Sequence, residues 1–148
     1  MRAVIQRVTS AFVTVEGEKI SSIDKGILIL LGIQVGDTYK DIQYLSKKIT
    51  NLRIFENKGN FDLSIFDIGG KALVVSQFTL LGRTKKGNRP DFLLAEKPDK
   101  AKELYDKFCD ELNKIIDVEK GIFGAKMKIT LVNDGPVTII IDTKENLL

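Results

Sequence analysis

The residues best suited to chemistry in this sequence lie in one short segment, Ser76–Leu80, which reads S-Q-F-T-L. The segment supplies hydroxyls, an amide and an aromatic ring directly after the apolar run Ala72–Val75. Residues at the ends of buried strands commonly build the sites of α/β folds. We therefore expect a site at the end of this strand. Its candidate catalytic residues are Ser76, Gln77, Phe78 and Thr79.

The composition limits the chemistry that this site can perform. The chain contains no histidine and one cysteine, Cys109. Ser-His-Asp and Cys-His mechanisms, His-ligated metal sites and the commonest general base are therefore excluded. Hydrolysis would have to use hydroxyls, carboxylates, amines, backbone groups or the substrate itself, and we expect no metal and no cofactor. Cys109 cannot form an intramolecular disulfide, and we expect it to be an inert packing residue.

A cluster of positive charge follows the candidate site. Segment Gly82–Pro90 contains no acidic residue, and its cations are Arg83, Lys85, Lys86 and Arg89. Its G-x-x-x-x-G spacing matches the start of a P-loop, but Asn-Arg follows where that motif needs Lys and then Ser or Thr. We therefore reject nucleoside triphosphate binding. Two interpretations remain, a solvated loop and a loop that engages RNA phosphates, and the adjacent site favours the second. The net charge of +3 is compatible with an anionic partner but does not single one out.

Apolar periodicity predicts the elements that must position these residues. Strands are expected over 2–9, 12–15, 19–23, 26–33, 72–77, 127–132 and 137–142. One amphipathic helix begins at the capping-box pair Thr38 and Asp41, and a second begins at Pro98. The buried stripe of the second helix would consist of Ala101, Leu104, Phe108, Leu112 and Ile115.

The predicted fold is a single α/β domain over residues 1–148, in which residues 144–148 form a short polar tail. Strands outnumber helices too heavily for alternating βαβ winding, so we expect a β-rich mixed or antiparallel sheet covered by the two amphipathic helices. No run approaches the roughly 18 apolar residues that span a bilayer, and the start of the chain lacks signal-peptide architecture. We expect a cytoplasmic protein that does not enter a membrane.

The last candidate, Asp134–Pro136, lies between the two C-terminal strands. An Asp-Gly-Pro sequence is typical of an ordinary turn, and only about 5–6% of X-Pro bonds in folded proteins are cis. Taken alone, the dipeptide Gly135-Pro136 is expected to be trans and without function.

Four segments together resemble a known family. Residues 2–8 read R-A-V-I-Q-R-V, 76–80 read S-Q-F-T-L, 87–92 read G-N-R-P-D-F and 133–138 read N-D-G-P-V-T. In this order and spacing they resemble the D-aminoacyl-tRNA deacylases, over residues 1–143. The chain departs from the family at Gly59–Asp62, which reads G-N-F-D where members often have G-K-M-N.

The resemblance implies a homodimer that hydrolyses the ester between a D-amino acid and tRNA and that also releases glycine from mischarged tRNA. It implies that Ser76, Gln77, Phe78 and Thr79 line the pocket. Gly135-Pro136 would be a cis dipeptide inserted from one subunit into the site of the other, and Arg7 would lie near it. Such a main-chain element can grip the α-amino group and block the L side-chain direction whatever the side chain is, and glycine removes the Cβ that would crowd its approach. The cations Arg83, Lys85, Lys86 and Arg89 would then bind tRNA.

The absence of histidine bears on the mechanism that the resemblance implies. Thr79 is an obvious nucleophile candidate, but a hydroxyl without an adjacent base is weak. We favour water activated with help from the 2′-hydroxyl of the terminal adenosine, with Thr79 positioning the substrate. Two other functions remain open at this point: an RNA-binding module without catalysis, and a hydrolase of other small esters.

Overall fold

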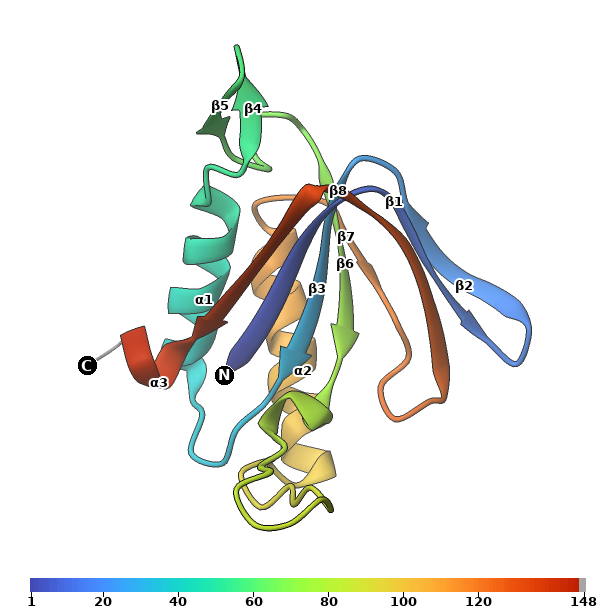
Figure 1. The fold of residues 1–148 in the computed structure, drawn as a ribbon, viewed down its shortest axis with the longest axis vertical. Helices are drawn as coiled ribbons and strands as arrows, with labels where there is room; N and C mark the ends of the chain where they lie inside the picture. Colours follow the sequence, from blue (N-terminus) through green and yellow to red (C-terminus); the bar gives the residue numbers. More distant parts are fainter. Residues whose placement is uncertain (147–148) are drawn as a thin grey trace.

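The computed structural model describes residues 1–146 and is built around one large sheet (Figure 1). Its strands are β1 (Arg2–Val15), β2 (Glu18–Ile23), β3 (Gly26–Gly32), β4 (Phe55–Asn57), β5 (Asn60–Leu63), β6 (Lys71–Ser76), β7 (Val118–Lys120) and β8 (Met127–Asp142). Its helices are α1 (Tyr39–Asn51), α2 (Pro98–Asn113), α3 (Thr143–Asn146) and the single 3₁₀ turn η1 (Phe78–Leu81).

Six strands form a mixed sheet in the order β2-β1-β3-β6-β7, with β8 also paired to β1. Strand β6 runs parallel to both β3 and β7, whereas β1 is antiparallel to β2, β3 and β8. Strands β4 and β5 form a separate hairpin. The expected α/β class with a mixed sheet is confirmed.

The two longest strands, β1 and β8, are bent and enclose a second core. The first half of β1 pairs with β3 and its second half with β2, while β8 follows both halves. The main core lies between the sheet and helices α1 and α2. A smaller core containing Val13, Leu28 and Val75 lies between the two parts of the bent sheet. Figure 1 shows β2 and the adjoining parts of β1 and β8 set apart from the strands that the helices cover. Strand β3 is therefore buried on both faces, as its continuous apolar sequence predicts.

Some predicted boundaries are wrong. Segments 2–9 and 12–15 form one continuous strand, and 127–132 and 137–142 are joined in β8. Strands β1 and β8 pair with each other along their whole length. The ladder of backbone hydrogen bonds between them therefore resumes after every irregularity. Ile115 is not a core residue: α2 ends at Asn113, and the N–H groups of the two residues that follow bond three residues back. This tightened turn leaves Ile115 40% exposed and buries Ile116 instead.

A buried ion cluster fastens the start of α1 to the end of β8. The Met1 α-amino group donates to Asp37 Oδ1 at 2.8 Å and to Thr143 Oγ1 at 2.7 Å. The predicted capping box is present, with the Thr38 N–H donating to Asp41 Oδ2 at 2.8 Å. Burial favours a raised pKa for Asp41, but hydrogen bonds from Thr143 and Thr38 and the nearby positive charges outweigh it and lower the pKa to about 2.

The segment expected to be a polar tail, 144–148, begins inside α3. Lys144 Nζ lies 3.0 Å from Asp37 Oδ1 and 3.4 Å from Asp41 Oδ1, so this end of the helix belongs to the ion cluster. Residues 147–148 lie outside the described residues. Within residues 1–146, no helix combines the length and the apolar character needed to cross a membrane.

Candidate functional site

The predicted site motif lies at the C-terminal end of β6. That buried strand ends at Ser76, and the Gln77 N–H donates to the Leu31 carbonyl at 2.8 Å, which keeps the chain against the end of β3. The chain then turns into η1, which carries Phe78 and Thr79. The structure therefore brings the four residues predicted from the motif together at a strand end.

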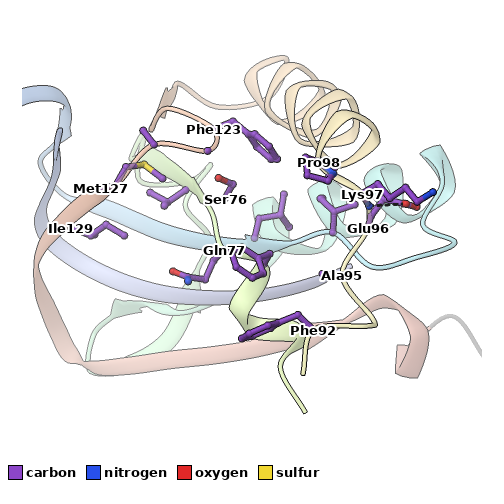
Figure 2. A pocket seen from close by; sticks show the side chains of 17 residues that line it. Ser76, Gln77, Phe92, Ala95, Glu96, Lys97, Pro98, Phe123, Met127 and Ile129 are labelled. Atoms are coloured by element: carbon purple, nitrogen blue, oxygen red, sulfur yellow. Dashed lines mark hydrogen bonds between the residues drawn. The ribbon is translucent and has the colours of Figure 1, made fainter. Parts of the chain in front are cut away.

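A pocket of about 600 Å³ opens beside this motif (Figure 2). Ser76, Gln77 and Phe78 contribute to its lining, together with the loop before α2 and the connection from β7 to β8. Phe78 meets Phe92 edge-on, with ring centroids 5.1 Å apart, and Phe123 lies across the pocket. A cavity of this size, with aromatic walls and a few polar groups, suits a small organic ligand.

Thr79 lies outside the lining of this pocket and is exposed. Its hydroxyl accepts a hydrogen bond from Gln77 Nε2. Among residues 1–146, Gln77 is the one side chain that bonds to this hydroxyl, and an amide is not a base. The geometry fits a positioned hydroxyl better than an activated nucleophile.

Two charged residues of the pocket, Glu96 and Lys97, were missed by sequence reasoning. They precede α2, and the Glu96 N–H donates to the Ile33 carbonyl at 3.0 Å, which brings the loop to the end of β3. Glu96 accepts from the Lys97 N–H at 2.9 Å (Figure 2). Its carboxylate also lies 3.1 Å from Lys100 Nζ. The Lys97 N–H and then Lys100 lower the pKa of Glu96, so its carboxylate is a poor proton acceptor. Within residues 1–146, no group of three acidic, Cys or His residues comes together as a metal site.

Gly135-Pro136 lies in an irregular segment of β8 that faces Arg7 of β1. The pairing passes from Gln6 opposite Thr138 to Val8 opposite Asn133, so several extra residues of β8 are looped out. The peptide bond is cis, as the resemblance implies, and the trans bond expected from the dipeptide alone is wrong. Both Gly135 and Pro136 are exposed.

Arg7 holds this segment by its main chain. The side chain is nearly buried, and its Nε donates to the Asp134 carbonyl at 3.1 Å while Nη1 donates to the Ile54 carbonyl at 2.7 Å. From the other side, Asn133 Nδ2 donates to the carbonyls of Arg7 and Val137, each at 3.0 Å. These hydrogen bonds of Arg7 and Asn133 fix the main chain on both sides of the exposed dipeptide.

The departure from the family pattern at Gly59–Asp62 lies in the β4–β5 hairpin, close to Arg7. Phe61 is 55% exposed, and the Arg7 guanidinium carbon lies 5.5 Å from its ring centroid, within the range of a cation–π contact. Phe61 does not line the pocket beside Ser76. The substitution therefore bears on the surroundings of Arg7.

Within one chain, the dipeptide Gly135-Pro136 and the pocket motif Ser76–Thr79 do not come together. Arg7 is paired with Ile27 at the start of β3, and Ile27 with Ala72 at the start of β6. Ser76 lies at the other end of β6, roughly 13 Å farther along at about 3.3 Å per residue. Gly135-Pro136 and the pocket motif therefore lie at opposite ends of the sheet.

The four cations of the basic segment differ in their surroundings. Arg83 is paired with Asp91, with Nε and Oδ1 2.9 Å apart, and their backbones form a bridge that closes the loop. Lys85, Lys86 and Arg89 are exposed, and none of them has an acidic partner within residues 1–146. The loop therefore offers three cations without an acidic partner among the described residues, and the Arg83–Asp91 pair joins the two ends of this loop.

The chain is similar to known proteins over nearly its whole length. The family model described as D-Tyr-tRNA(Tyr) deacylase matches residues 4–142. The D-aminoacyl-tRNA deacylase of Persephonella marina is 54% identical over 145 residues, covering 97% of this chain and 99% of that protein. The protein of the same name from Aquifex aeolicus is 54% identical over 147 residues, covering 98% and 99%. A solved structure described as c-Myc DNA Unwinding Element Binding Protein has a TM-score of 0.92 and 46% identity, covering 96% of this chain and 98% of that one.

Proposed function

The chain belongs to the D-Tyr-tRNA(Tyr) deacylase family, and on that premise we propose that it hydrolyses the ester bond between a D-amino acid and tRNA. The observation that carries the proposal is the whole-length match to the deacylases, and the aromatic-walled pocket at the S-Q-F-T motif is consistent with it. Because charged tRNA is the substrate, we place the activity in the cytoplasm.

The pocket suits the terminal nucleoside of tRNA. Its volume of about 600 Å³ and the rings of Phe78, Phe92 and Phe123 would accommodate a base, which stacks well on aromatic side chains. Lys85, Lys86 and Arg89 project from the loop that follows η1 and would contact phosphates of the same RNA. With the nucleoside in the pocket, the ester would lie toward η1 and Thr79.

A second copy of the chain is needed to bring Gly135-Pro136 to this ester. Between the two motifs lies an uncovered face of the sheet, where Val4 stands opposite both Leu30 and Ile140, and Gln6 opposite Thr138. Ile140 is 68% exposed there. A two-fold axis through this face would place the dipeptide of each copy at the pocket motif of the other, which is the geometry of an isologous dimer.

In such a dimer the main chain of Gly135-Pro136 would sense the handedness of the amino acid. Backbone carbonyls would hold the α-amino group, and the space on the L side would be filled by main chain. Glycine has no side chain to exclude, so glycyl-tRNA would also be a substrate. The contacts of Arg7 and Asn133 support this role because they leave the dipeptide little freedom to yield.

The chemistry would be water attack on the ester carbonyl, assisted by the substrate. The 2′-hydroxyl of the terminal adenosine would accept a hydrogen bond from the attacking water. The bond to the ribose oxygen would then break, and that oxygen would take a proton. Main-chain N–H groups of η1 would face the developing oxyanion, where one donor is worth roughly 2.7–4 kcal/mol. Holding the water and the ester in the right orientation can lower the activation barrier by about 7–11 kcal/mol, so an activated ester needs no protein base.

The decisive experiment compares purified protein on D-aminoacyl, L-aminoacyl and glycyl-tRNA. Release of the D-residue and of glycine, with the L-ester left intact, is expected; equal release of D- and L-residues would refute the proposal. A tRNA that ends in 2′-deoxyadenosine should react far more slowly, and an equal rate would reject assistance by the 2′-hydroxyl. An acyl-enzyme trapped with wild type and absent in Thr79→Ala would make Thr79 the nucleophile.

Nucleic-acid binding without catalysis is a second candidate, because the 46% identical solved structure is named as a protein that binds a DNA element. The uncommitted cations of the basic loop would serve that function equally well. Incubation with D-aminoacyl-tRNA separates the two functions, since binding without release of the amino acid would favour the second. Free D-aminoacyl esters hydrolysed as fast as charged tRNA would instead indicate a hydrolase of small esters.

A further inference from the structure

The turn that carries Thr79 is held by an arginine that belongs to neither the pocket nor the basic loop. We propose that Arg2 is a positioning residue for the proposed reaction, and that it fixes η1 through the main-chain carbonyl of Leu80. The inference rests on the proposed function for its effect on catalysis, but its structural part is tested separately below.

The guanidinium of Arg2 binds two different elements at once. Its Nη1 donates to the Leu80 carbonyl at 2.8 Å, and its Nε donates to Asp142 Oδ2 at 2.9 Å. Nη2 lies 2.9 Å from the same carboxylate oxygen. Arg2 and Asp142 stand directly opposite each other on the paired strands β1 and β8, so the carboxylate is held by the sheet. The arginine side chain is 32% exposed and that of Asp142 is 6% exposed, so water competes weakly for the acceptor.

The turn needs this outside donor because of its length. Within η1, the carbonyl of Gln77 accepts from the Leu80 N–H at 3.3 Å, and that of Thr79 accepts from the Gly82 N–H at 3.0 Å. A single 3₁₀ turn has few internal bonds, and the last carbonyls of a helix have no partner inside it. Arg2 supplies the partner for Leu80, as basic side chains often do at helix ends.

The same end of the sheet lets η1 come close. Gly32, the residue of β3 paired with Arg2, has no side chain, and a Cβ there would lie 3.1 Å from the Gln77 carbonyl oxygen and 3.4 Å from Leu80 Cβ. The turn therefore rests on the main chain of β3, and the guanidinium beside Gly32 holds it there. With Arg2 removed, η1 would keep its contact with β3 but lose its hydrogen bond to the side chain of β1 that Asp142 of β8 holds in place.

The expected consequence is a loss of alignment between Thr79 and the ester. A displacement of about 1 Å by a mutation away from the reacting atoms can reduce a rate about 100-fold. The nucleoside pocket does not contain Arg2, so binding of the RNA should change little. We therefore expect a fall in kcat with a nearly constant KM.

The test uses Arg2→Lys in the full chain, with Lys102→Ala on the exposed face of α2 as the matched control. A lysine can remain paired with Asp142 but cannot also reach the carbonyl in a fixed fork. We expect kcat to fall at least tenfold and KM to stay within about threefold, with an unchanged pH profile. Asp142→Asn should lower kcat in the same direction, and the double variant should be no worse than Arg2→Lys alone. Wild-type kcat in Arg2→Lys, or a change confined to KM, would overturn the proposal.

Amide hydrogen exchange provides a readout that does not depend on the activity. Exchange in peptides covering Phe78–Gly82 should be faster in Arg2→Lys than in wild type, while α1 and β3 stay protected. A uniform increase over the whole chain would indicate a general loss of stability and would contradict a local role. If the wild-type protein released no amino acid, the proposed function would fail, while faster local exchange in Arg2→Lys would still support the anchoring of η1.

Discussion

Replacing Gly135 with alanine tests whether the shape of the main chain at this residue supports the proposed chirality sensor. Gly135 has φ +127°, a conformation that side-chain-bearing residues rarely adopt. A Cβ there would lie 2.8 Å from Arg7 Nη2 and 2.8 Å from Val137 Cγ2. The matched control is Gly17→Ala in the β1–β2 turn, where φ is +81° and no atom lies within 4 Å of an added Cβ.

The two variants share one penalty and differ in a second. An unfavourable φ at a non-glycine residue costs of the order of 1–3 kcal/mol, and both variants incur it. In Gly135→Ala the guanidinium of Arg7 must also move, which weakens its 3.1 Å hydrogen bond to the Asp134 carbonyl. A hydrogen bond from a charged group is worth about 1.5–3 kcal/mol. Gly135→Ala should therefore be less stable than Gly17→Ala by about 2 kcal/mol.

The assay combines thermal unfolding with deacylation of D- and L-aminoacyl-tRNA. At about 2–4 °C per kcal/mol, Gly135→Ala should melt roughly 4–8 °C below Gly17→Ala. Its D-to-L ratio should fall at least tenfold, whereas Gly17→Ala should keep the wild-type ratio. If Gly135→Ala melted like its control and kept the wild-type ratio, neither the contact with Arg7 nor the conformation of Gly135 would matter for discrimination.

Three other predictions concern charge and reactivity. The pKa of Asp41 is lowered to about 2, so its carboxylate stabilises the fold above about pH 4 and this contribution is lost as the pH falls toward 2. Asp41→Asn should be about 2 kcal/mol less stable at pH 7 in urea unfolding, with a flatter dependence on pH in that acid range; an unchanged dependence would contradict the assignment. Replacing Lys85 and Lys86 by alanine should lower the slope of log affinity for tRNA against log salt by about 1 for each phosphate that is no longer neutralised, and Lys102→Ala should leave it unchanged. Burial raises the pKa of Cys109 to about 12, so iodoacetamide should label it in urea but not in the native protein, and rapid native labelling seen by mass spectrometry would refute this.

Local patterns predicted the parts of the molecule that depend on neighbouring residues. The capping box at Thr38 and the doubly buried strand at 26–33 are each encoded by a few adjacent side chains, and both are present. The position of Ser76–Thr79 at a strand end follows in the same way, since an apolar run stops where polar residues begin.

Long-range contacts decided the parts that the sequence did not reveal. Glu96 enters the pocket because the loop before α2 bonds to the end of β3, and no spacing within that loop indicates this. Arg83 resembled the other cations of its segment, but a bridge between distant parts of the loop pairs it with Asp91. Continuity of β8 across Gly135-Pro136 depends on the antiparallel partner β1, which lies more than a hundred residues earlier in the chain.

Strand β1 links the two halves of the proposed composite site. Arg2 donates to the Leu80 carbonyl beside the pocket, and Arg7 donates to the Asp134 carbonyl beside the dipeptide, so each guanidinium fixes a main-chain segment. In the proposed dimer each site combines the pocket of one copy with the dipeptide of the other. Arg2→Lys therefore affects the site at its own subunit's pocket, whereas Gly135→Ala affects the site at the partner's pocket. A mixture of Arg2→Lys and Gly135→Ala subunits should then form mixed dimers in which one site carries both lesions and the other carries neither.

Random exchange of equal amounts would give mixed dimers in about half of the population, and therefore intact sites at about one quarter of all positions. If each variant refolded alone releases the D-residue at no more than a tenth of the wild-type rate, refolding the two together should raise this release to about a quarter of the wild-type value, above the average of the two separate variants. Refolding each variant alone provides the control. If co-refolding gave only that average, the pocket and the dipeptide would have to act within one chain, where the sheet holds them at opposite ends.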